Sequence, residues 1–442
     1  MQSQNNQPRV IIIGGGFAGL ELAKKLRGTI FDVILFDKQN FHTFQPLLYQ
    51  VATGGLRIES IAYPFRKIFR KSKNVAFRME EVMAVHPSRN QIVTASDRLS
   101  YDYLVVATGS QSNFFNFTPV QKMLMPLKNS RDALHLRSFI LQNFEKANVS
   151  ADEELREELI NVAIVGGGPT GVELAGAIAE MKKYVFPQDF PQMDVEQMRI
   201  ILFEAAPKLL GPMSEEASEH ALKYLKEFGV EVHLNSMVDD YDGKVLKTKD
   251  GEVLRTNTVI WTAGVKGAFP DGFPKHCVAP AHRLKVDQFN RLEGFANIYA
   301  LGDAAAMVDE GLPKGHPMLA TVALQQARNL AQNLVKQIKN KSPQPFEYKD
   351  KGTMATIGRN RAVVDLPRWK FQGKLAWFVW IFVHIFSLIG FRNKLAALWD
   401  WAYNFFTYDR AVQLIITPFE RSKNVPHVDS EKTRKQEKVT TE

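Results

Sequence analysis

The residues best suited to chemistry lie in two glycine-rich turns, residues 14–19 (GGGFAG) and 166–171 (GGGPTG), each between an apolar run and a helical pattern. In such turns the first glycine permits a tight bend, the second lets the backbone approach a pyrophosphate, and the third allows close packing of the helix. The helix N-terminus adds unpaired N–H groups and a positive dipole end. Two turns of this kind predict a protein that holds two dinucleotides and passes electrons between them.

An acidic residue follows each turn at the end of the next predicted strand. Asp37 follows the first turn at close to the interval of about 20 residues at which a carboxylate meets a ribose hydroxyl. Glu204 follows the second turn at a longer interval, which we explain by an inserted loop over residues 182–198 that contains Pro187 and Pro191. An acid rather than an arginine at Glu204 favours NADH over NADPH, because it would repel a second phosphate.

Short apolar runs and amphipathic periods predict the elements that position these residues. Around the first turn, the expected strands are residues 9–13, 32–36, 101–106 and 298–301, and the expected helix is 17–26. Around the second turn, the expected strands are residues 162–165, 200–203 and 230–234, and the expected helices are 172–181 and 219–228. Short buried strands that alternate with helices indicate parallel sheets covered by helices.

Composition excludes several classes of protein. The 442 residues are 45% hydrophobic and 23% charged, which is typical of a globular chain of more than one domain. Cys277 is the single cysteine, so a disulfide framework and a Cys-x-x-Cys metal or redox pair are excluded. Residues 1–10 lack a signal-peptide pattern, and we expect the catalytic part to stay in a reducing cytosol.

The C-terminal region is aromatic and basic. Residues 375–391 are almost wholly apolar, and residues 395–406 add tryptophan, tyrosine and phenylalanine. The net charge is +9, and between residues 351 and 394 the single acid is Asp365. This combination favours a membrane surface over nucleic acid, and the shortness of the apolar run favours a helix pair lying in the interface over a spanning helix. The charged tail, residues 421–442, is expected to be disordered.

Four stretches of the sequence resemble a known family. They are residues 40–53 (NFHTFQPLLYQVAT), 166–176 (GGGPTGVELAG), 300–303 (ALGD) and 358–362 (GRNRA). Through these stretches the chain resembles the flavoproteins with two dinucleotide-binding domains and, among them, the type II NADH dehydrogenases. The resemblance covers nearly the whole chain.

This resemblance implies an α/β fold with two Rossmann-like dinucleotide-binding domains and a C-terminal amphipathic helical region that anchors the protein to a membrane. The expected FAD-binding domain has two segments, residues 8–118 and 276–350, on either side of an NADH-binding domain at residues 119–275. The membrane-anchoring region is expected at residues 351–420 and the charged tail at 421–442. The implied cofactors are FAD and NADH, and no metal is expected.

The resemblance also implies which residues contact the cofactors. The first turn with Asp37 matches the site of the ADP half of FAD, Asp303 matches the acid at its ribitol and pyrophosphate end, and Val82 matches a backbone contact to adenine. The second turn with Glu204 matches the NADH site. The expected contacts are Gly14, Gly16, Phe17, Ala18, Gly19, Asp37, Lys38, Val82, Ala107, Thr108, Gly109, Gly166, Gly168, Thr170, Gly171, Glu204, Gly264, Gly302, Asp303, Ala323 and Leu324.

Four further residues are expected to act in catalysis. Glu173 matches a family glutamate near the nicotinamide, and its alternative role is that of an acid favoured by the helix dipole. Thr321 replaces the first glutamine of the family's Ala-Gln-x-Ala-x-Gln motif, so Gln325 is the stronger candidate for the quinone, and Gln326 is expected to face solvent. Lys394 lies either near the reduced flavin or at the membrane edge as a snorkelling lysine.

The implied reaction is hydride transfer from NADH to FAD, followed by passage of two electrons and two protons to a membrane quinone, ubiquinone or menaquinone, without proton pumping. The implied location is the cytoplasmic face of the cell inner membrane, and the implied assembly is a homodimer. The lone Cys277 excludes relatives that need a redox-active cysteine pair. Two alternatives stay open, a soluble NADH-dependent ferredoxin or rubredoxin reductase and a non-enzymatic flavin-binding redox sensor. His42 and His384 are assigned no catalytic role.

Overall fold

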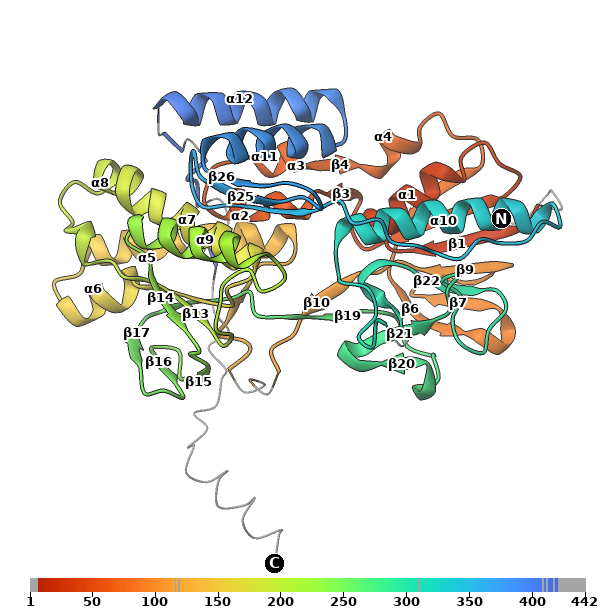
Figure 1. Cartoon of the computed structure of the whole chain (residues 1–442), viewed down its shortest axis with the longest axis horizontal. Helices are drawn as coiled ribbons and strands as arrows, with labels where there is room; N and C mark the ends of the chain where they lie inside the picture. Colours follow the sequence, from red (N-terminus) through yellow and green to blue (C-terminus); the bar gives the residue numbers. More distant parts are fainter. Residues whose placement is uncertain are drawn as a thin grey trace, which may run out of the picture.

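The computed structural model describes residues 7–115, 117, 120–308, 311–407, 409–410, 412–415 and 418–419. Figure 1 shows two α/β lobes side by side, with a pair of C-terminal helices along the top edge. Each lobe is built on a five-stranded sheet.

The first lobe contains a parallel sheet with the strand order β22-β9-β1-β2-β5. Its strands are β1 (Arg9–Ile13), β2 (Asp32–Asp37), β5 (Val75–Met79), β9 (Tyr103–Val106) and β22 (Ile298–Ala300). After Arg9, strand β1 consists of branched apolar residues that are buried, as a central parallel strand requires. One face of the sheet packs against α1 (Phe17–Lys25) and α10 (Ala320–Ile338), and the other packs against β6 (Val82–His86), β7 (Gln91–Thr94) and β8 (Arg98–Ser100).

The second lobe repeats this plan with the strand order β11-β18-β12-β13-β14. Its strands are β11 (Met125–Pro126), β12 (Val162–Val165), β13 (Ile200–Glu204), β14 (Glu231–Leu234) and β18 (Thr258–Trp261). Helices α5 (Ser130–Val149), α7 (Pro169–Glu180) and α9 (Glu215–Glu227) cover one face, and β15 (Val238–Tyr241), β16 (Val245–Thr248) and β17 (Val253–Arg255) cover the other. Both sheets are therefore Rossmann-like, as predicted.

The chain passes between the lobes twice. The two connecting segments contain β10 (Ser110–Ser112) and β19 (Val265–Gly267), which pair with each other as antiparallel strands. Figure 1 shows them bridging the space between the lobes. The chain then forms β20 (Val278–Ala279), β21 (Arg283–Val286) and β23 (Ala305–Met307) on the first lobe. The stretch after β2 forms β3 (Phe41–Thr43), α2 (Leu48–Ala52), α3 (Ile58–Ile61), β4 (Ala62–Pro64) and α4 (Phe65–Phe69).

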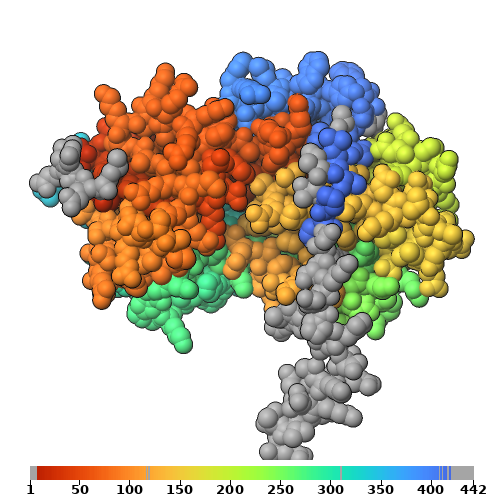
Figure 2. All heavy atoms as spheres, turned by 180° about the vertical axis from the view of Figure 1, so that it is seen from behind, coloured from red at the N-terminus to blue at the C-terminus, as the bar shows by residue number. Residues whose placement is uncertain are grey.

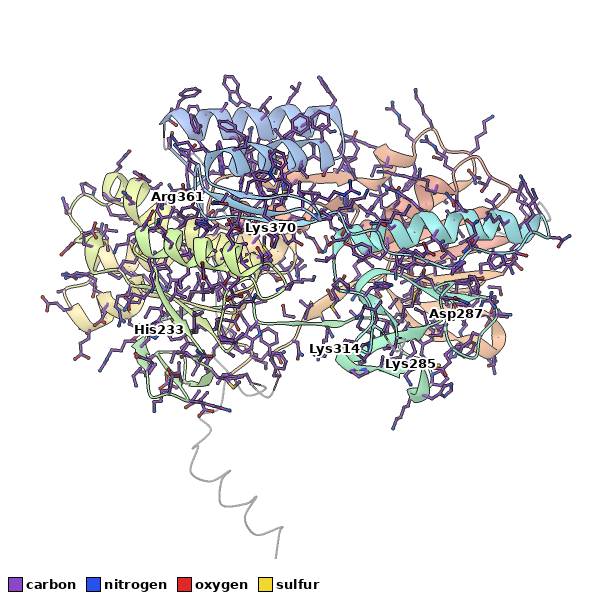
Figure 3. All side chains as sticks on the ribbon, viewed as in Figure 1. His233, Lys285, Asp287, Lys314, Arg361 and Lys370 are labelled. Carbon is purple, nitrogen blue, oxygen red and sulfur yellow. The ribbon has the colours of Figure 1, made fainter. Side chains whose placement is uncertain are left out.

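The C-terminal region is a small antiparallel sheet followed by two helices. The elements are β24 (Thr353–Thr356), β25 (Ala362–Asp365), β26 (Lys370–Gln372), α11 (Lys374–Ser387) and α12 (Phe391–Thr407). Arg361 attaches this sheet to the second lobe, because its guanidinium lies 2.8 Å from Glu227 and 4.6 Å over the Phe228 ring (Figure 3). Among the described helices, none combines the length and the hydropathy needed to cross a bilayer.

The chain after α12 returns across the back of the second lobe. Figure 2 shows this segment crossing the residues of α5. The Phe419 amide donates to Gln142 at 2.9 Å, and the Phe419 ring lies 5.1 Å from His135 and 5.5 Å from Phe139. The C-terminal region is thus held on both sides of the second lobe. The tail predicted to be disordered, residues 421–442, lies outside the described residues.

One element prediction is wrong. Residues 182–198 are not a loop, because the chain continues from α7 into a π-helical turn, η3 (Met181–Val185), then α8 (Phe186–Asp189) and a short 3-10 turn, η4 (Val195–Gln197). Phe186 stacks on Phe144 of α5 with ring centroids 3.8 Å apart, and this burial outweighs the breaking tendency of the prolines. Two predicted helices begin earlier than expected, α7 at a proline suited to the first helical position and α9 after the capping residue Ser214.

Candidate functional site

The first glycine turn joins β1 to α1. Gly14 has a φ of +99°, and a Cβ there would overlap the Ala107 carbonyl, so glycine is required. Asp37 accepts a hydrogen bond from the Gly15 amide at 2.6 Å, so the acid at the end of β2 holds the middle of the turn. Gly16 differs from its neighbours, since a Cβ there would meet open space. That open space is where a pyrophosphate would approach the backbone.

The second turn has the same geometry between β12 and α7. The Gly167 amide donates to Glu204 at 2.5 Å, and the other carboxylate oxygen of Glu204 accepts from the Ala206 amide at 2.7 Å. A Cβ on Gly168 would again meet open space. Although the interval before Glu204 is longer, this acid has the same position in the second turn as Asp37 has in the first.

Both helices that follow these turns lack a side-chain cap at the N-terminus. Helices α5, α6 (Glu153–Ile160) and α9 are capped by Asn129, Asp152 and Ser214, whereas α1 and α7 begin at Gly16 and Gly168 with no side-chain hydrogen bond. The first N–H groups of an uncapped helix require another partner, and a phosphate is a suitable one. The residues at both turns therefore fit the pyrophosphate of a dinucleotide.

Asp303 and Gly302 lie in a 3-10 turn, η7 (Gly302–Ala304), between the first sheet and α10. Asp303 accepts from the Ser110 hydroxyl at 2.5 Å and lies 3.7 Å from the Lys128 ammonium. The Gly302 amide donates to the side chain of Gln326 at 2.7 Å, and Gln326 is buried. The prediction that Gln326 faces solvent is wrong, because this side chain satisfies a buried backbone N–H.

The other predicted cofactor residues lie mainly around the first turn. Val82 is the buried first residue of β6, and Lys38 forms an ion pair with Glu81 at 2.5 Å. Gly109 and Gly264 both have a positive φ and lie where the chain enters β10 and β19. The rest are placed as follows: Phe17, Ala18 and Gly19 on α1, Ala107 and Thr108 after β9, Thr170 and Gly171 on α7, and Ala323 and Leu324 on α10.

Glu173 lies on α7, one turn after the second glycine turn, and is only 8% exposed. Its carboxylate accepts a long hydrogen bond, 3.4 Å, from the Thr356 amide. Burial raises the pKa of Glu173 to about 8, opposed by contacts with Thr356 and Trp380. A carboxyl group with this pKa retains its proton at neutral pH and can release it when a nearby group becomes more basic.

Tyr49 links this carboxyl to the C-terminal helices. Its hydroxyl lies 2.8 Å from the Thr356 hydroxyl and accepts from the Gln50 amide at 2.9 Å. Burial raises the pKa of Tyr49, and the charge of Glu173 raises it further. Gln50 in turn accepts from the Trp401 indole of α12 at 2.5 Å. A chain of hydrogen bonds therefore connects Trp401 to Thr356, beside Glu173.

Tyr49, Gln50, Thr356 and Trp401 line a pocket between α2, α7, β24 and the C-terminal helices. Aromatic rings form much of its wall, including Tyr49, Trp377, Trp380 and Trp401. An apolar, aromatic pocket with a few polar groups is suited to a planar ring that carries oxygen atoms.

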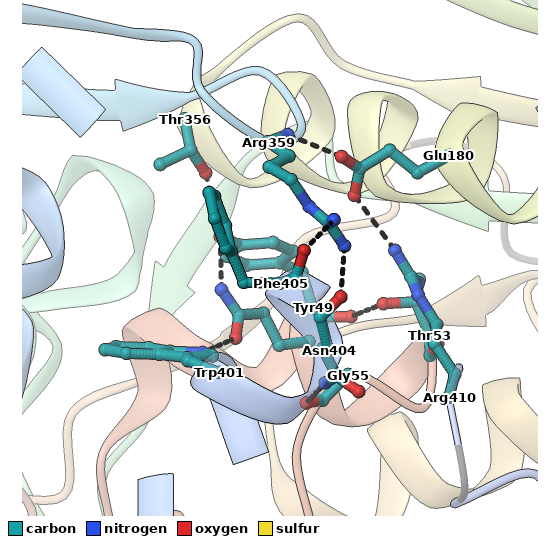
Figure 4. Close-up of polar contacts among 11 residues, drawn as sticks. Tyr49, Thr53, Gly55, Glu180, Thr356, Arg359, Trp401, Asn404, Phe405 and Arg410 are labelled. Atoms are coloured by element: carbon teal, nitrogen blue, oxygen red, sulfur yellow. Dashed lines mark hydrogen bonds and ion pairs between the residues drawn. The ribbon is translucent and has the colours of Figure 1, made fainter. Parts of the chain in front are cut away.

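An ion cluster contributes further residues to the wall of the pocket, and its contacts are drawn in Figure 4. Glu180, at the end of α7, accepts from the Arg359 amide at 2.5 Å and from the Arg410 guanidinium at 3.0 Å. The Arg359 guanidinium donates to the carbonyls of Asn404 and Phe405 at the end of α12, at 2.5 and 2.8 Å. The cluster therefore attaches the last turn of α12 to the helix that carries Glu173.

The other three predicted catalytic residues do not contact Glu173. Thr321 lies 3.0 Å from the Tyr348 hydroxyl, and Gln325 exchanges two hydrogen bonds with the Lys349 backbone, at 2.9 and 3.0 Å. Lys394 donates to the Phe386 carbonyl at 2.9 Å, between α12 and α11. Thr321 and Gln325 share α10 with Gln326, so they belong to the Gly302 side of the first lobe.

Of the two histidines considered from the sequence, His42 is buried and His384 is half-buried. Burial lowers the pKa of His42 and of His384 to about 4. His42 lies 2.9 Å from the Gly15 carbonyl, so its Nδ1 carries the proton. His384 stacks on Trp380 with ring centroids 3.9 Å apart and lies 2.7 Å from the Trp380 carbonyl. Both rings are therefore packed against neighbouring groups.

Comparison with known proteins decides between the possible activities. The pyridine nucleotide-disulphide oxidoreductase family matches residues 8–327, and the NDH2 C-terminal domain matches residues 351–408. The type II NADH:quinone oxidoreductase Ndh of Mycobacterium tuberculosis is 36% identical over 428 residues, which cover 92% of this chain and 90% of that protein. This chain belongs to the type II NADH:quinone oxidoreductases.

Other members and structures of the family agree. The type II NADH:quinone oxidoreductase of Haemophilus influenzae is 30% identical and covers 84% of this chain and 91% of that protein. The structure of NDH2 from Plasmodium falciparum in complex with NADH has a TM-score of 0.84 at 22% identity, covers 93% of this chain and 100% of that chain, and shows the shared fold. Type II NADH:quinone oxidoreductases transfer electrons from NADH to a quinone without pumping protons, so both alternatives left open by the sequence are set aside.

Sequence reasoning missed most of the pocket. Tyr49 lies within a recognised stretch but received no role, and Trp380 was one aromatic residue in an apolar run. Glu180, Arg359 and Arg410 also received no role. The usable signals were the positions of Tyr49 and Arg359 inside the stretches of resemblance at residues 40–53 and 358–362.

Proposed function

We propose that this type II NADH:quinone oxidoreductase receives its quinone in the aromatic pocket beneath α11 and α12. The observation that carries the proposal is Glu173, a buried carboxyl with a raised pKa, located between the second glycine turn and a pocket walled by Tyr49 and Trp380. A quinone ring is planar and apolar, and it needs hydrogen-bond donors at its oxygens when it is reduced. The Tyr49 hydroxyl, in the wall of the pocket, can supply such a donor.

The residues at the two turns support FAD at the first turn and NADH at the second. FAD, when bound at the first turn, supplies the two-electron chemistry that connects a hydride donor to a quinone. Asp37 and Glu204 would each bind a ribose hydroxyl, and the uncapped N-termini of α1 and α7 would each bind a pyrophosphate. Asp303, beside Ser110 and Lys128, would bind the opposite end of FAD.

Glu173 would hold the proton that a reduced quinone requires. Because burial keeps Glu173 protonated at neutral pH, it can donate to a quinone oxygen that gains negative charge. Thr321 and Gln325, predicted on a helix against the flavin ring and the quinone, remain proposed contacts, as does Lys394, predicted near the reduced flavin.

The exposed aromatic face of α11 and α12 supports attachment to a membrane. Phe378, Phe382, Phe386 and Trp399 are each more than half exposed, and a soluble surface rarely presents so many large apolar side chains together. We propose that this face lies in the lipid interface on the cytoplasmic side of the cell inner membrane, where ubiquinone or menaquinone is available. The homodimer remains part of the proposal, and sedimentation in detergent tests it.

The test of the pocket separates the two halves of the reaction. In the holoenzyme without oxygen, NADH should bleach the oxidised flavin, and a short-chain ubiquinone or menaquinone should restore the colour. Tyr49→Phe should raise the quinone KM severalfold and leave bleaching by NADH unchanged, while Tyr184→Phe, outside the pocket, should change neither. Slower bleaching in Tyr49→Phe, or an unchanged quinone KM, would contradict the proposal that the quinone binds in this pocket.

A further inference from the structure

A dense group of positive charges follows β4 in the first lobe. The basic segment, residues 66–73, contains Arg66, Lys67, Arg70, Lys71 and Lys73, and all five side chains are exposed. No acidic residue occurs between residues 62 and 79. The positive charge of this segment is therefore not offset by neighbours in the sequence.

The fold does not neutralise the basic segment either. Arg66 lies 5.5 Å over the ring of Phe77, which leaves its charge in place. The ion pairs among the described residues all involve other cations, as in Arg57 with Asp400 and Arg9 with Asp32. Exposed like charges within one short segment repel one another and lower stability. An external anionic partner would remove this cost.

The basic segment lies beside the turn that joins the two C-terminal helices. Asn393 of α12 donates to the carbonyls of Glu59 and Ala62, at 3.0 and 2.8 Å, and Gly390 packs against the Tyr63 ring. Ile389 packs on the core cluster that contains Phe65 and Phe69 of α4. The helix that begins the basic segment thus shares a core with the turn between α11 and α12.

The basic segment also faces the same side of the molecule as the aromatic helices. In Figure 1, α4 and the connection that follows it rise to the top edge, next to α11 and α12. In the reverse view, Figure 2, residues of this part of the first lobe and the C-terminal helices again form the top of the molecule. A flat surface that contacts the aromatic face would therefore also come close to the basic segment.

We infer that the basic segment binds the anionic headgroups of membrane lipids and gives the enzyme a second point of attachment on the first lobe. This inference rests on the proposed attachment through α11 and α12, and it adds the chemistry of the lipid. Each lysine or arginine near a negatively charged bilayer contributes about 1 kcal/mol, or roughly fivefold in affinity, and the contribution falls with salt. Duplex nucleic acid is the competing partner for a basic surface, but it offers nothing for the adjoining aromatic face.

The test compares full-length holoenzyme on neutral and anionic vesicles. Wild-type protein should bind phosphatidylcholine vesicles, and it should bind vesicles with about 30% phosphatidylglycerol more tightly in low salt. A variant with Lys67, Arg70, Lys71 and Lys73 each replaced by glutamine should keep its binding to neutral vesicles and lose more than tenfold on the anionic ones. The matched control replaces four exposed lysines at the opposite edge, Lys247, Lys249, Lys275 and Lys314. It should retain the anionic preference.

The outcomes separate this inference from the proposed attachment. If wild-type protein binds both kinds of vesicle equally, or if the control variant loses as much as the test variant, the inference is overturned and the aromatic attachment stands. If wild-type protein binds neither kind, the aromatic attachment fails as well. Binding to duplex DNA that matches the binding to anionic vesicles and disappears in the test variant would also overturn the lipid assignment. Unchanged NADH oxidation with a water-soluble acceptor verifies that the variants are folded.

Discussion

Replacing Glu173 by glutamine tests whether this buried carboxyl holds a proton at neutral pH. Burial raises its pKa from 4.5 to about 8, so the folded protein binds the proton more tightly than the unfolded chain does. Between these two values the folded state holds more protons than the unfolded state, and its stability falls as pH rises. Glutamine keeps the acceptor for the Thr356 amide but carries no charge at any pH.

The size of the effect follows from the two pKa values. At pH 7 the buried carboxyl costs the folded wild-type protein about 3 kcal/mol relative to an uncharged group, and at pH 5 about 1 kcal/mol. The Glu173→Gln variant should therefore be more stable than wild type by an amount that grows by about 2 kcal/mol between pH 5 and pH 7. In a protein of this size the melting temperature should differ by a few degrees more at the higher pH.

The assay is thermal melting of the two holoenzymes across this pH range, with Glu216→Gln as the control for an exposed carboxyl on α9. The same preparations are assayed for quinone reduction, where Glu173→Gln should lower kcat and lose the alkaline limb near pH 8 while flavin reduction by NADH is retained. A melting difference that does not change with pH would refute the raised pKa. An unchanged quinone kcat in the Glu173→Gln variant would show that Glu173 does not take part in proton transfer.

The remaining predictions concern three other polar contacts. Glu204→Arg should shift the ratio of kcat/KM values toward NADPH by roughly tenfold or more, because it replaces repulsion of a second phosphate by a charged hydrogen bond; steady-state kinetics with both nucleotides measures it. Arg410→Met should destabilise the protein by about 3–5 kcal/mol, since it leaves Glu180 as a buried and poorly compensated charge, and adding Glu180→Gln should restore much of the loss in a melting experiment. Gln326→Leu should cost about 1–3 kcal/mol, because the buried Gly302 amide loses its acceptor; chemical denaturation measures this loss.

The sequence alone predicted an element correctly where the residues of one short segment are enough to favour a single secondary structure. The strands Arg9–Ile13 and Val162–Val165 were predicted with their observed bounds, because runs of branched apolar residues followed by glycine have few other structures. The segment after α7 was predicted wrongly, since Pro187 and Pro191 indicated a loop and the stacking of Phe186 on a distant helix was not visible locally. Tertiary burial outweighed local propensity there.

The pocket illustrates a second limit of prediction from the sequence. Tyr49, Thr356 and Trp401 are far apart in sequence, and hydrogen bonds bring them into one chain only after the C-terminal helices fold back over α2. No local period or spacing predicts such a contact. Gln326 was misjudged for a related reason, because the helix period identifies which face is apolar but not that a backbone amide from another turn needs an acceptor on that face.

The ion cluster is difficult to explain by stability alone. Buried ion pairs are weak stabilisers, and apolar side chains of similar volume often serve as well. The cluster nevertheless places Arg359 and Arg410 against one acid, Glu180, in the wall of the pocket, while the neighbouring Glu173 is kept neutral by burial. These three side chains therefore bring two positive charges and one negative charge to the wall. A quinone that accepts electrons gains negative charge, and fixed positive charge in a region of low dielectric stabilises that state more than the neutral quinone. On the proposed function, the cluster and the protonated Glu173 thus act in the same direction, and both favour the reduced product over the substrate.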